Sequence, residues 1–162
     1  MNRIAIVGSP GSGKSTFARQ LGDQLGIEVT HLDSHFWNPG WVETPQEEWK
    51  VRHGELTARD RWILDGTYLR TIDVRLERAD TVITLQSSRW GCLFRVIRRI
   101  VTNYGKDVQA RGCPERFDFE FLKYVWDFPK DYQPLIDEAV EKNRHSLRIV
   151  RLKSSAEFEI SA

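Results

Sequence analysis

The sequence has few cysteines and no long apolar run. Cys92 and Cys113 are the only cysteines, and their separation fits neither a zinc ribbon nor a redox pair. No apolar stretch approaches the roughly 18–20 residues that span a bilayer, and the first residues lack the pattern of a secretory signal. We therefore expect a cytoplasmic protein in a reducing compartment, with no membrane partner.

An excess of charge of one sign is also missing. Lysine and arginine number 24 and aspartate and glutamate 23, which gives a formal net charge of +1. A protein whose whole surface binds nucleic acid would be strongly basic, so nucleic acid is not the expected partner. The net charge does not rule out a local basic groove. The chain of 162 residues has neither internal repeats nor a low-complexity linker, and we predict one domain over residues 1–162.

Short apolar runs alternate with helical patterns along the chain. The predicted strands are residues 3–7, 28–32, 62–64, 81–85 and 147–152. Apolar spacing predicts helices over residues 17–25, 88–101, 117–128 (stopped by Pro129) and 135–140, and a short final helix from residue 154. The alternation predicts a three-layer α/β fold with a parallel sheet, in which ligands bind at the carboxyl ends of the strands.

A glycine-rich segment follows the first predicted strand and opens the first helix. Residues 8–15 read Gly-Ser-Pro-Gly-Ser-Gly-Lys-Ser and match the Walker A pattern G-x-x-x-x-G-K-[ST]. Its glycines let backbone N–H groups point at phosphate oxygens, and the following helix adds the positive end of its dipole. The predicted nucleotide-binding residues are Gly8, Ser9, Pro10, Gly11, Ser12, Gly13, Lys14, Ser15 and Thr16.

Two residues of this segment have specific predicted roles. Lys14 can reach the β- and γ-phosphates, and the Ser15 hydroxyl can ligate Mg²⁺. Asp65 follows the apolar third strand and looks like the Walker B carboxylate that holds Mg²⁺ directly or through water. The pattern therefore predicts ATP and Mg²⁺ as cofactors.

The order of loop, helix, second strand, Asp33, third strand and Asp65 resembles the nucleoside-monophosphate-kinase-like group, which includes adenylate, shikimate and gluconate kinases. A closer resemblance covers nearly the whole chain and is to the bacterial adenylate-kinase-related "DNA topology modulation" (FlaR-type) proteins. The segments that carry it are residues 31–33, 36–37, 39–42, 65–68, 75–80, 112–115, 117–118 and 152–154.

The resemblance implies a P-loop NTPase fold with a five-stranded parallel sheet in the order 2-3-1-4-5. It also implies an acceptor-binding arm at about residues 34–60 and a lid at about residues 103–130. In similar kinases the lid helix supplies arginines to the nucleotide and to the phosphoryl group, and Arg95 and Arg99 match that position. Lys153 follows the last strand, where related folds place the adenine.

The sequence does not identify the acceptor or the residues that bind it. Asp33 ends the neighbouring strand and could orient the acceptor hydroxyl, accept its proton or share the metal. Adenylate kinases continue the third-strand motif as Asp-Gly-Phe-Pro-Arg and shikimate kinases carry a glycine run, whereas residues 65–70 read Asp-Gly-Thr-Tyr-Leu-Arg. Arg70 and Arg75 either bind an anionic acceptor or belong to the surface. The aromatic residues of the arm either stack on a ring or fill its core; they are Phe36, Trp37, Trp41, Trp49 and Tyr68.

The predicted function is transfer of the γ-phosphoryl group of ATP to a small acceptor, with a nucleotide or nucleoside slightly preferred. Lys14, Asp33, Arg95 and Arg99 are the predicted catalytic residues. Two alternatives remain: an ATP-binding regulator that affects DNA topology or transcription, and a plain NTPase.

Overall fold

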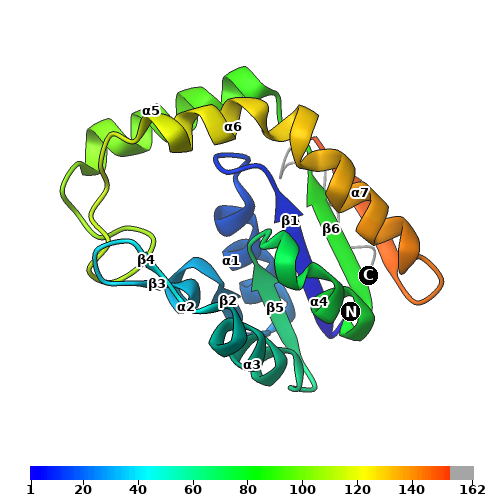
Figure 1. Ribbon diagram of the computed structural model, residues 1–162. Helices are drawn as coiled ribbons and strands as arrows, with labels where there is room; N and C mark the ends of the chain where they lie inside the picture. The colour runs from blue at the N-terminus through cyan, green and yellow to red at the C-terminus, as the bar shows by residue number, and fades with distance from the viewer. Residues whose placement is uncertain (154–162) are drawn as a thin grey trace.

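The protein is built on one parallel β-sheet. The structure, a computed structural model, describes residues 1–153, so the helix predicted from residue 154 lies outside the described residues. The five strands of the sheet are β1 (Arg3–Gly8), β2 (Val29–His31), β5 (Trp62–Asp65), β6 (Thr81–Leu85) and β7 (Arg148–Leu152). They are parallel and lie in the order β2-β5-β1-β6-β7, which confirms the predicted order 2-3-1-4-5 (Figure 1).

The central strand β1 shows why this sheet forms. Ile4 and Ile6 belong to one core cluster with Phe17 and Leu21 of the first helix. Ala5 and Val7 alternate with them and belong to the cluster on the opposite face. Because all four side chains are fully buried, a continuous apolar run is needed here, as in other parallel sheets covered on both faces.

Helices cover both faces of the sheet. Helix α1 (Lys14–Leu25) lies on one face, and α3 (Gln46–Thr57), α4 (Ile72–Arg78) and α7 (Gln133–Lys142) lie on the other (Figure 1). Two longer helices, α5 (Arg89–Asn103) and α6 (Phe119–Asp131), run side by side beyond the carboxyl end of β6. None of the helices within residues 1–153 is both long and apolar enough to cross a membrane.

The connections carry short elements that shape the site. Between β2 and α3 lie the short helix α2 (Asp33–Phe36) and a hairpin of β3 (Trp37–Asn38) and β4 (Val42–Glu43). A single 3₁₀ turn, η1 (Leu69–Thr71), precedes α4. Asp33, predicted to close a strand, therefore begins a helix.

The predicted stop before Pro129 is wrong. Helix α6 continues through Pro129 to Asp131, and only Tyr132 separates it from α7. Proline removes one backbone donor from the last turn, but Phe128 is buried and its ring stacks on Tyr132 at 5.6 Å. The burial of these aromatic rings outweighs one lost hydrogen bond.

Candidate active site

A large cavity opens at the carboxyl end of the sheet. Its volume is about 980 Å³, within the range of ligand pockets, and it lies between the phosphate-binding loop, the 37–43 hairpin and helices α5 and α6. Its lining includes the residues predicted to carry the chemistry, namely Lys14, Ser15, Asp33, Asp65, Arg95 and Arg99. These residues come from sequence positions up to 85 residues apart and meet because parallel strands end at the same edge.

The phosphate-binding loop needs its glycines for close approach as well as for backbone conformation. Gly8, Gly11 and Gly13 all have positive φ, at 145°, 76° and 95°. A Cβ atom on Gly8 would lie 2.3 Å from the carbonyl oxygen of Leu85, and one on Gly11 would lie 2.5 Å from that of Cys92. The loop is thus packed against β6 and α5, with Gly13 leading directly into α1.

Lys14 lies across this loop. Its Nζ atom donates a hydrogen bond to the carbonyl oxygen of Ser9 at 2.8 Å. Burial lowers the pKa of Lys14 below its usual value, while the nearby carboxylates of Asp65 and Asp33 act in the opposite direction. A polyanion bound in the loop would favour the charged ammonium, as phosphate binding requires.

Asp65 ends β5 in a position suited to a metal ion. Its Oδ2 accepts a hydrogen bond from Nδ1 of His31 at 2.8 Å. Burial alone would raise the pKa of Asp65, but the bonds from His31 and Ser15 and the charge of Lys14 outweigh it and lower the pKa. Its Oδ1 is buried and has no hydrogen-bond partner within residues 1–153.

These features fit Mg²⁺. Among the described residues no three His, Cys, Asp or Glu side chains gather as a metal cage. Mg²⁺ is commonly held by one or two protein oxygens together with water and substrate phosphates, so such a cage is not needed. Asp65, through its unpartnered Oδ1, and Ser15, through its hydroxyl, are the residues that would hold Mg²⁺.

Asp33 differs from Asp65 in environment. Burial raises the pKa of Asp33, and the hydrogen bond from Tyr68 only partly offsets this effect. The Tyr68 hydroxyl donates to Oδ1 of Asp33 at 2.5 Å. Two carboxylates whose pKa values move in opposite directions are suited to different tasks, one staying ionised and the other able to take up a proton.

The two predicted arginines of α5 lie on the cavity side of the helix. Nε of Arg95 donates to the carbonyl oxygen of Gly11 at 2.5 Å, which ties the helix to the phosphate-binding loop. Arg99 lies one turn further and forms an ion pair with the buried Glu115. Arg98, between them, is exposed and does not line the cavity.

Arg75, predicted either to bind an anionic acceptor or to lie at the surface, is buried and does not line the cavity. Its side chain is fully buried, and its guanidinium donates to the carbonyl oxygens of Gly66 and Thr67. Burial lowers the pKa of Arg75 to about 10, so it stays charged at neutral pH. Arg75 therefore supports the turn after β5, whereas Arg70 does line the cavity.

Other cavity residues were missed or undervalued in the sequence. Arg19 of α1 and His31 line the cavity, and neither of them was assigned a role in the site from the sequence. Of the arm aromatics, Trp49 is buried, and Phe36, Trp37 and Trp41 are half-buried; all four line the cavity. Their rings also pack on one another at centroid distances of 5.0–5.5 Å.

The 37–43 hairpin and the 104–118 loop both contribute to the cavity lining and are joined to each other. The amide of Gly40 donates to the carbonyl oxygen of Gly112 at 2.7 Å, and the indole Nε1 of Trp41 donates to that of Pro114 at 2.9 Å. The Cys113 thiol adds a bond to the carbonyl oxygen of Asn38 at 3.2 Å. We call these three contacts the clasp. The loop within the predicted lid is thus fastened to the hairpin.

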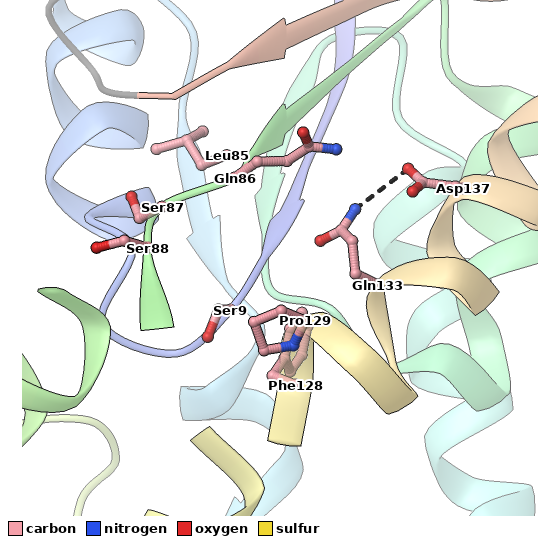
Figure 2. A pocket seen from close by; sticks show the side chains of 9 residues that line it. All are labelled: Ser9, Leu85, Gln86, Ser87, Ser88, Phe128, Pro129, Gln133 and Asp137. Atoms are coloured by element: carbon pink, nitrogen blue, oxygen red, sulfur yellow. Dashed lines mark hydrogen bonds between the residues drawn. The ribbon is translucent and has the colours of Figure 1, made fainter. Parts of the chain in front are cut away.

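Three predicted nucleotide contacts, Ser9, Ser12 and Lys153, do not line the large cavity. Ser9 faces a second cavity of about 360 Å³, between the end of β6 and the corner of α6 and α7 (Figure 2). Gln133 and Asp137, joined by a 3.2 Å hydrogen bond, form its far wall. Lys153 follows β7, and its carbonyl oxygen accepts a 3.4 Å bond from Ser87, but its side chain lines neither of these two cavities.

Sheet order, glycine-rich loop and helix layers together define the three-layer α/β fold of P-loop NTPases. The structure is similar to that of shikimate kinase from Acinetobacter baumannii in complex with shikimate, with a TM-score of 0.61 and 20% sequence identity. The similarity covers 100% of this chain and 85% of that one, and it confirms the predicted fold. No protein-family model and no curated protein matches the sequence.

Proposed function

We propose that the protein is an ATP-dependent phosphotransferase that moves the γ-phosphoryl group to a small acceptor. The observation that carries the proposal is the shared cavity, which holds the phosphate-binding loop, both aspartates and the α5 arginines. Lys14 and the loop amides would bind the triphosphate, and Ser15 and Asp65 would hold Mg²⁺. The ion would neutralise charge on the phosphates.

The proposal assigns a separate role to Asp33, to the α5 arginines and to the clasp. Asp33, whose pKa burial raises, accepts the proton of the acceptor hydroxyl. Arg95 and Arg99 stabilise charge on the phosphoryl oxygens during transfer. The clasp excludes water from the cavity, which favours transfer over hydrolysis.

The acceptor side favours a small molecule with a ring. Half-buried aromatic rings of the arm and Tyr68 line the same cavity as Phe121 and Tyr124 of α6. Arg70 lines the same space and suits an anionic group. A nucleotide or nucleoside has both a planar ring and a hydroxyl or phosphate, and it is the preferred acceptor.

Acceptor-dependent ADP formation tests the proposal. The protein is incubated with ATP and Mg²⁺ and with a panel of nucleosides, nucleotides, sugar acids and shikimate, with Lys14→Ala as the negative control. At least one acceptor should raise ADP formation well above the rate without acceptor. A rate that no acceptor changes would favour the plain NTPase instead.

A role in DNA binding finds less support. Among the arginines of α5, Arg89 lies over the ring of Trp126, Arg95 is bonded to the phosphate-binding loop and Arg99 is paired with Glu115. Arg98 is exposed, and its side chain forms no ion pair with any of residues 1–153. Salt-dependent DNA binding that weakens in Arg98→Ala would count for the regulatory function.

A further inference from the structure

Tyr68 has an unusual backbone conformation for its residue type. Its φ is +36°, and among residues 1–153 only one other non-glycine residue, Trp41, has a positive φ. A bulky side chain avoids this region unless its surroundings enforce it, and such residues cluster at functional sites. The contacts that hold Tyr68 in this conformation therefore need to be identified.

The surroundings of Tyr68 enforce the conformation from both sides. The buried guanidinium of Arg75 holds the carbonyl oxygens of the two preceding residues. The Thr67 hydroxyl donates to the carbonyl oxygen of Gly8 at 2.8 Å and accepts from its amide at 3.2 Å, which joins the turn to the phosphate-binding loop. On the other side, the Tyr68 carbonyl accepts from the amide of Thr71 at 3.0 Å.

The Tyr68 side chain is equally constrained. Its ring lies 4.7 Å from that of Phe36 and 5.1 Å from that of Trp49, measured between centroids. Packing of this kind leaves the hydroxyl little freedom, and it points at Oδ1 of Asp33, 2.5 Å away. The other carboxylate oxygen, Oδ2, has no hydrogen bond to any of the residues that the structure describes.

We propose that Tyr68 is a positioning residue for phosphoryl transfer: its hydroxyl fixes Oδ1 of Asp33 and thereby presents Oδ2 to the acceptor hydroxyl. The inference rests on the proposed function. In the transfer, the acceptor oxygen bonds to the γ-phosphorus while the bond from that phosphorus to the β–γ bridging oxygen breaks. ADP leaves with that electron pair, and the acceptor proton passes to Oδ2 of Asp33.

The Tyr68 hydroxyl is suited to stay a donor throughout. Burial and the neighbouring Asp33 raise the pKa of Tyr68 far above its usual value, so it does not ionise at physiological pH. Since a carboxylate that accepts such a bond is favoured in its charged form, Tyr68 also keeps Asp33 able to accept a proton.

A double-mutant cycle tests the role in turnover. Tyr68→Phe removes the hydroxyl and keeps the ring; Tyr104→Phe, at a largely exposed tyrosine outside the cavity lining, is the matched control. With the acceptor that the wild-type protein phosphorylates fastest in the panel, Tyr68→Phe should lower kcat about 10-fold or more and leave the KM for ATP within about 2-fold. Combined with Asp33→Asn, it should add no further loss.

The proposal would be overturned if the fold-losses in kcat of the two single variants multiplied in the double variant. An unchanged kcat in Tyr68→Phe would overturn it as well. Thermal unfolding of each variant shows whether a loss comes from the fold instead.

A second measurement needs no turnover. In protein with ¹³C-labelled aspartate carboxyls, the pKa of Asp33 should rise in Tyr68→Phe, because a donor to the carboxylate is lost, and stay unchanged in Tyr104→Phe. The other charged groups that act on Asp33, namely Asp65, Lys14 and Arg99, are present in both variants. An unchanged pKa in Tyr68→Phe overturns the positioning role. If the wild-type protein phosphorylates no acceptor, the proposed function fails while this titration still decides the contact.

Discussion

Arg99 of α5 and Glu115 of the 104–118 loop form an ion pair, with Nε of Arg99 3.0 Å from Oε1 of Glu115. The carboxylate side chain is only 3% exposed, so it is largely removed from water. The pair is close but not aligned as a hydrogen bond, and Nη2 of Arg99 is buried with no partner among residues 1–153. Arg99 therefore pairs with the loop and also lines the cavity.

Removing Arg99 should affect both stability and turnover. Arg99→Ala leaves the buried Glu115 without its counter-ion, and we expect the free energy of unfolding to fall by about 2 kcal/mol. It also removes a donor for the transferring phosphoryl group, so kcat should fall about 100-fold. Urea unfolding followed by tryptophan fluorescence measures the first effect, and acceptor-dependent ADP release measures the second.

Arg98→Ala is the matched control on the same helix. Arg98 is exposed, and its replacement should change stability by no more than about 0.5 kcal/mol and leave turnover unchanged. Equal effects of the two replacements would remove Arg99 from the site.

Lys14→Ala should abolish transfer while sparing the fold. Lys14 makes one hydrogen bond within the phosphate-binding loop, and its ammonium is expected to act on the phosphates. We expect a loss of about 100-fold or more in kcat, with little change in the melting temperature. Lys142→Ala, at an exposed lysine of α7, controls for the loss of a positive charge. Turnover that survives in Lys14→Ala would contradict the assignment of the donor site.

Asp65→Asn should change the dependence on Mg²⁺. The amide keeps the shape of the side chain but loses the charge that attracts the ion, so the Mg²⁺ concentration for half-maximal rate should rise about 10- to 100-fold. The rate is measured over a magnesium titration at saturating ATP. Asp33→Asn should lower the rate without this shift; the same shift in both variants would mean that both aspartates hold the metal.

Trp41→Phe should loosen the clasp. The replacement keeps an aromatic ring but removes the indole N–H that donates to the carbonyl oxygen of Pro114. We expect amide hydrogen exchange in residues 104–118 to become faster and hydrolysis of ATP by water to increase relative to transfer. Trp90→Phe, at a tryptophan that is 70% exposed on α5, should change neither quantity. If amide hydrogen exchange in residues 104–118 stays slow in Trp41→Phe, the other two hydrogen bonds of the clasp are sufficient to hold the loop.

His53 should make the protein less stable in acid. Burial, with a smaller contribution from the charge of Arg75, lowers the pKa of His53 to about 3. Since the unfolded chain takes up this proton near pH 6.5, the stabilising effect is complete above pH 6.5 and is lost as the pH falls toward 3. The expected slope is at most about 1.4 kcal/mol per pH unit.

Urea unfolding at several pH values between 7 and 4 measures this slope. His53→Gln, which cannot take up the proton, should show a smaller dependence on pH than the wild-type protein. An equal dependence in both proteins would assign the acid sensitivity to other groups.

Much of the architecture was predictable because it depends on local patterns. The apolar runs around Ile4, Ile63 and Ile83 are buried on both faces of the sheet, and such runs predict strands without knowledge of their neighbours. Pro129 shows the limit of that reasoning. Because proline lacks a backbone N–H, the sequence predicted that the helix ends before Pro129. In the structure the helix continues, and Phe128 packs against Tyr132.

Sequence alone determined the P-loop fold, since a glycine-rich loop between a strand and a helix has one common structure, and it predicted which residues would bind a triphosphate. Tertiary structure decided which side chains act on one another. Tyr68 meets Asp33 across 35 positions, and Arg75, open to two roles in the sequence, lies buried beneath the turn that holds Tyr68. A hydrogen bond or ion pair needs two groups placed to within a few tenths of an ångström, and only the packing of the whole chain sets such distances.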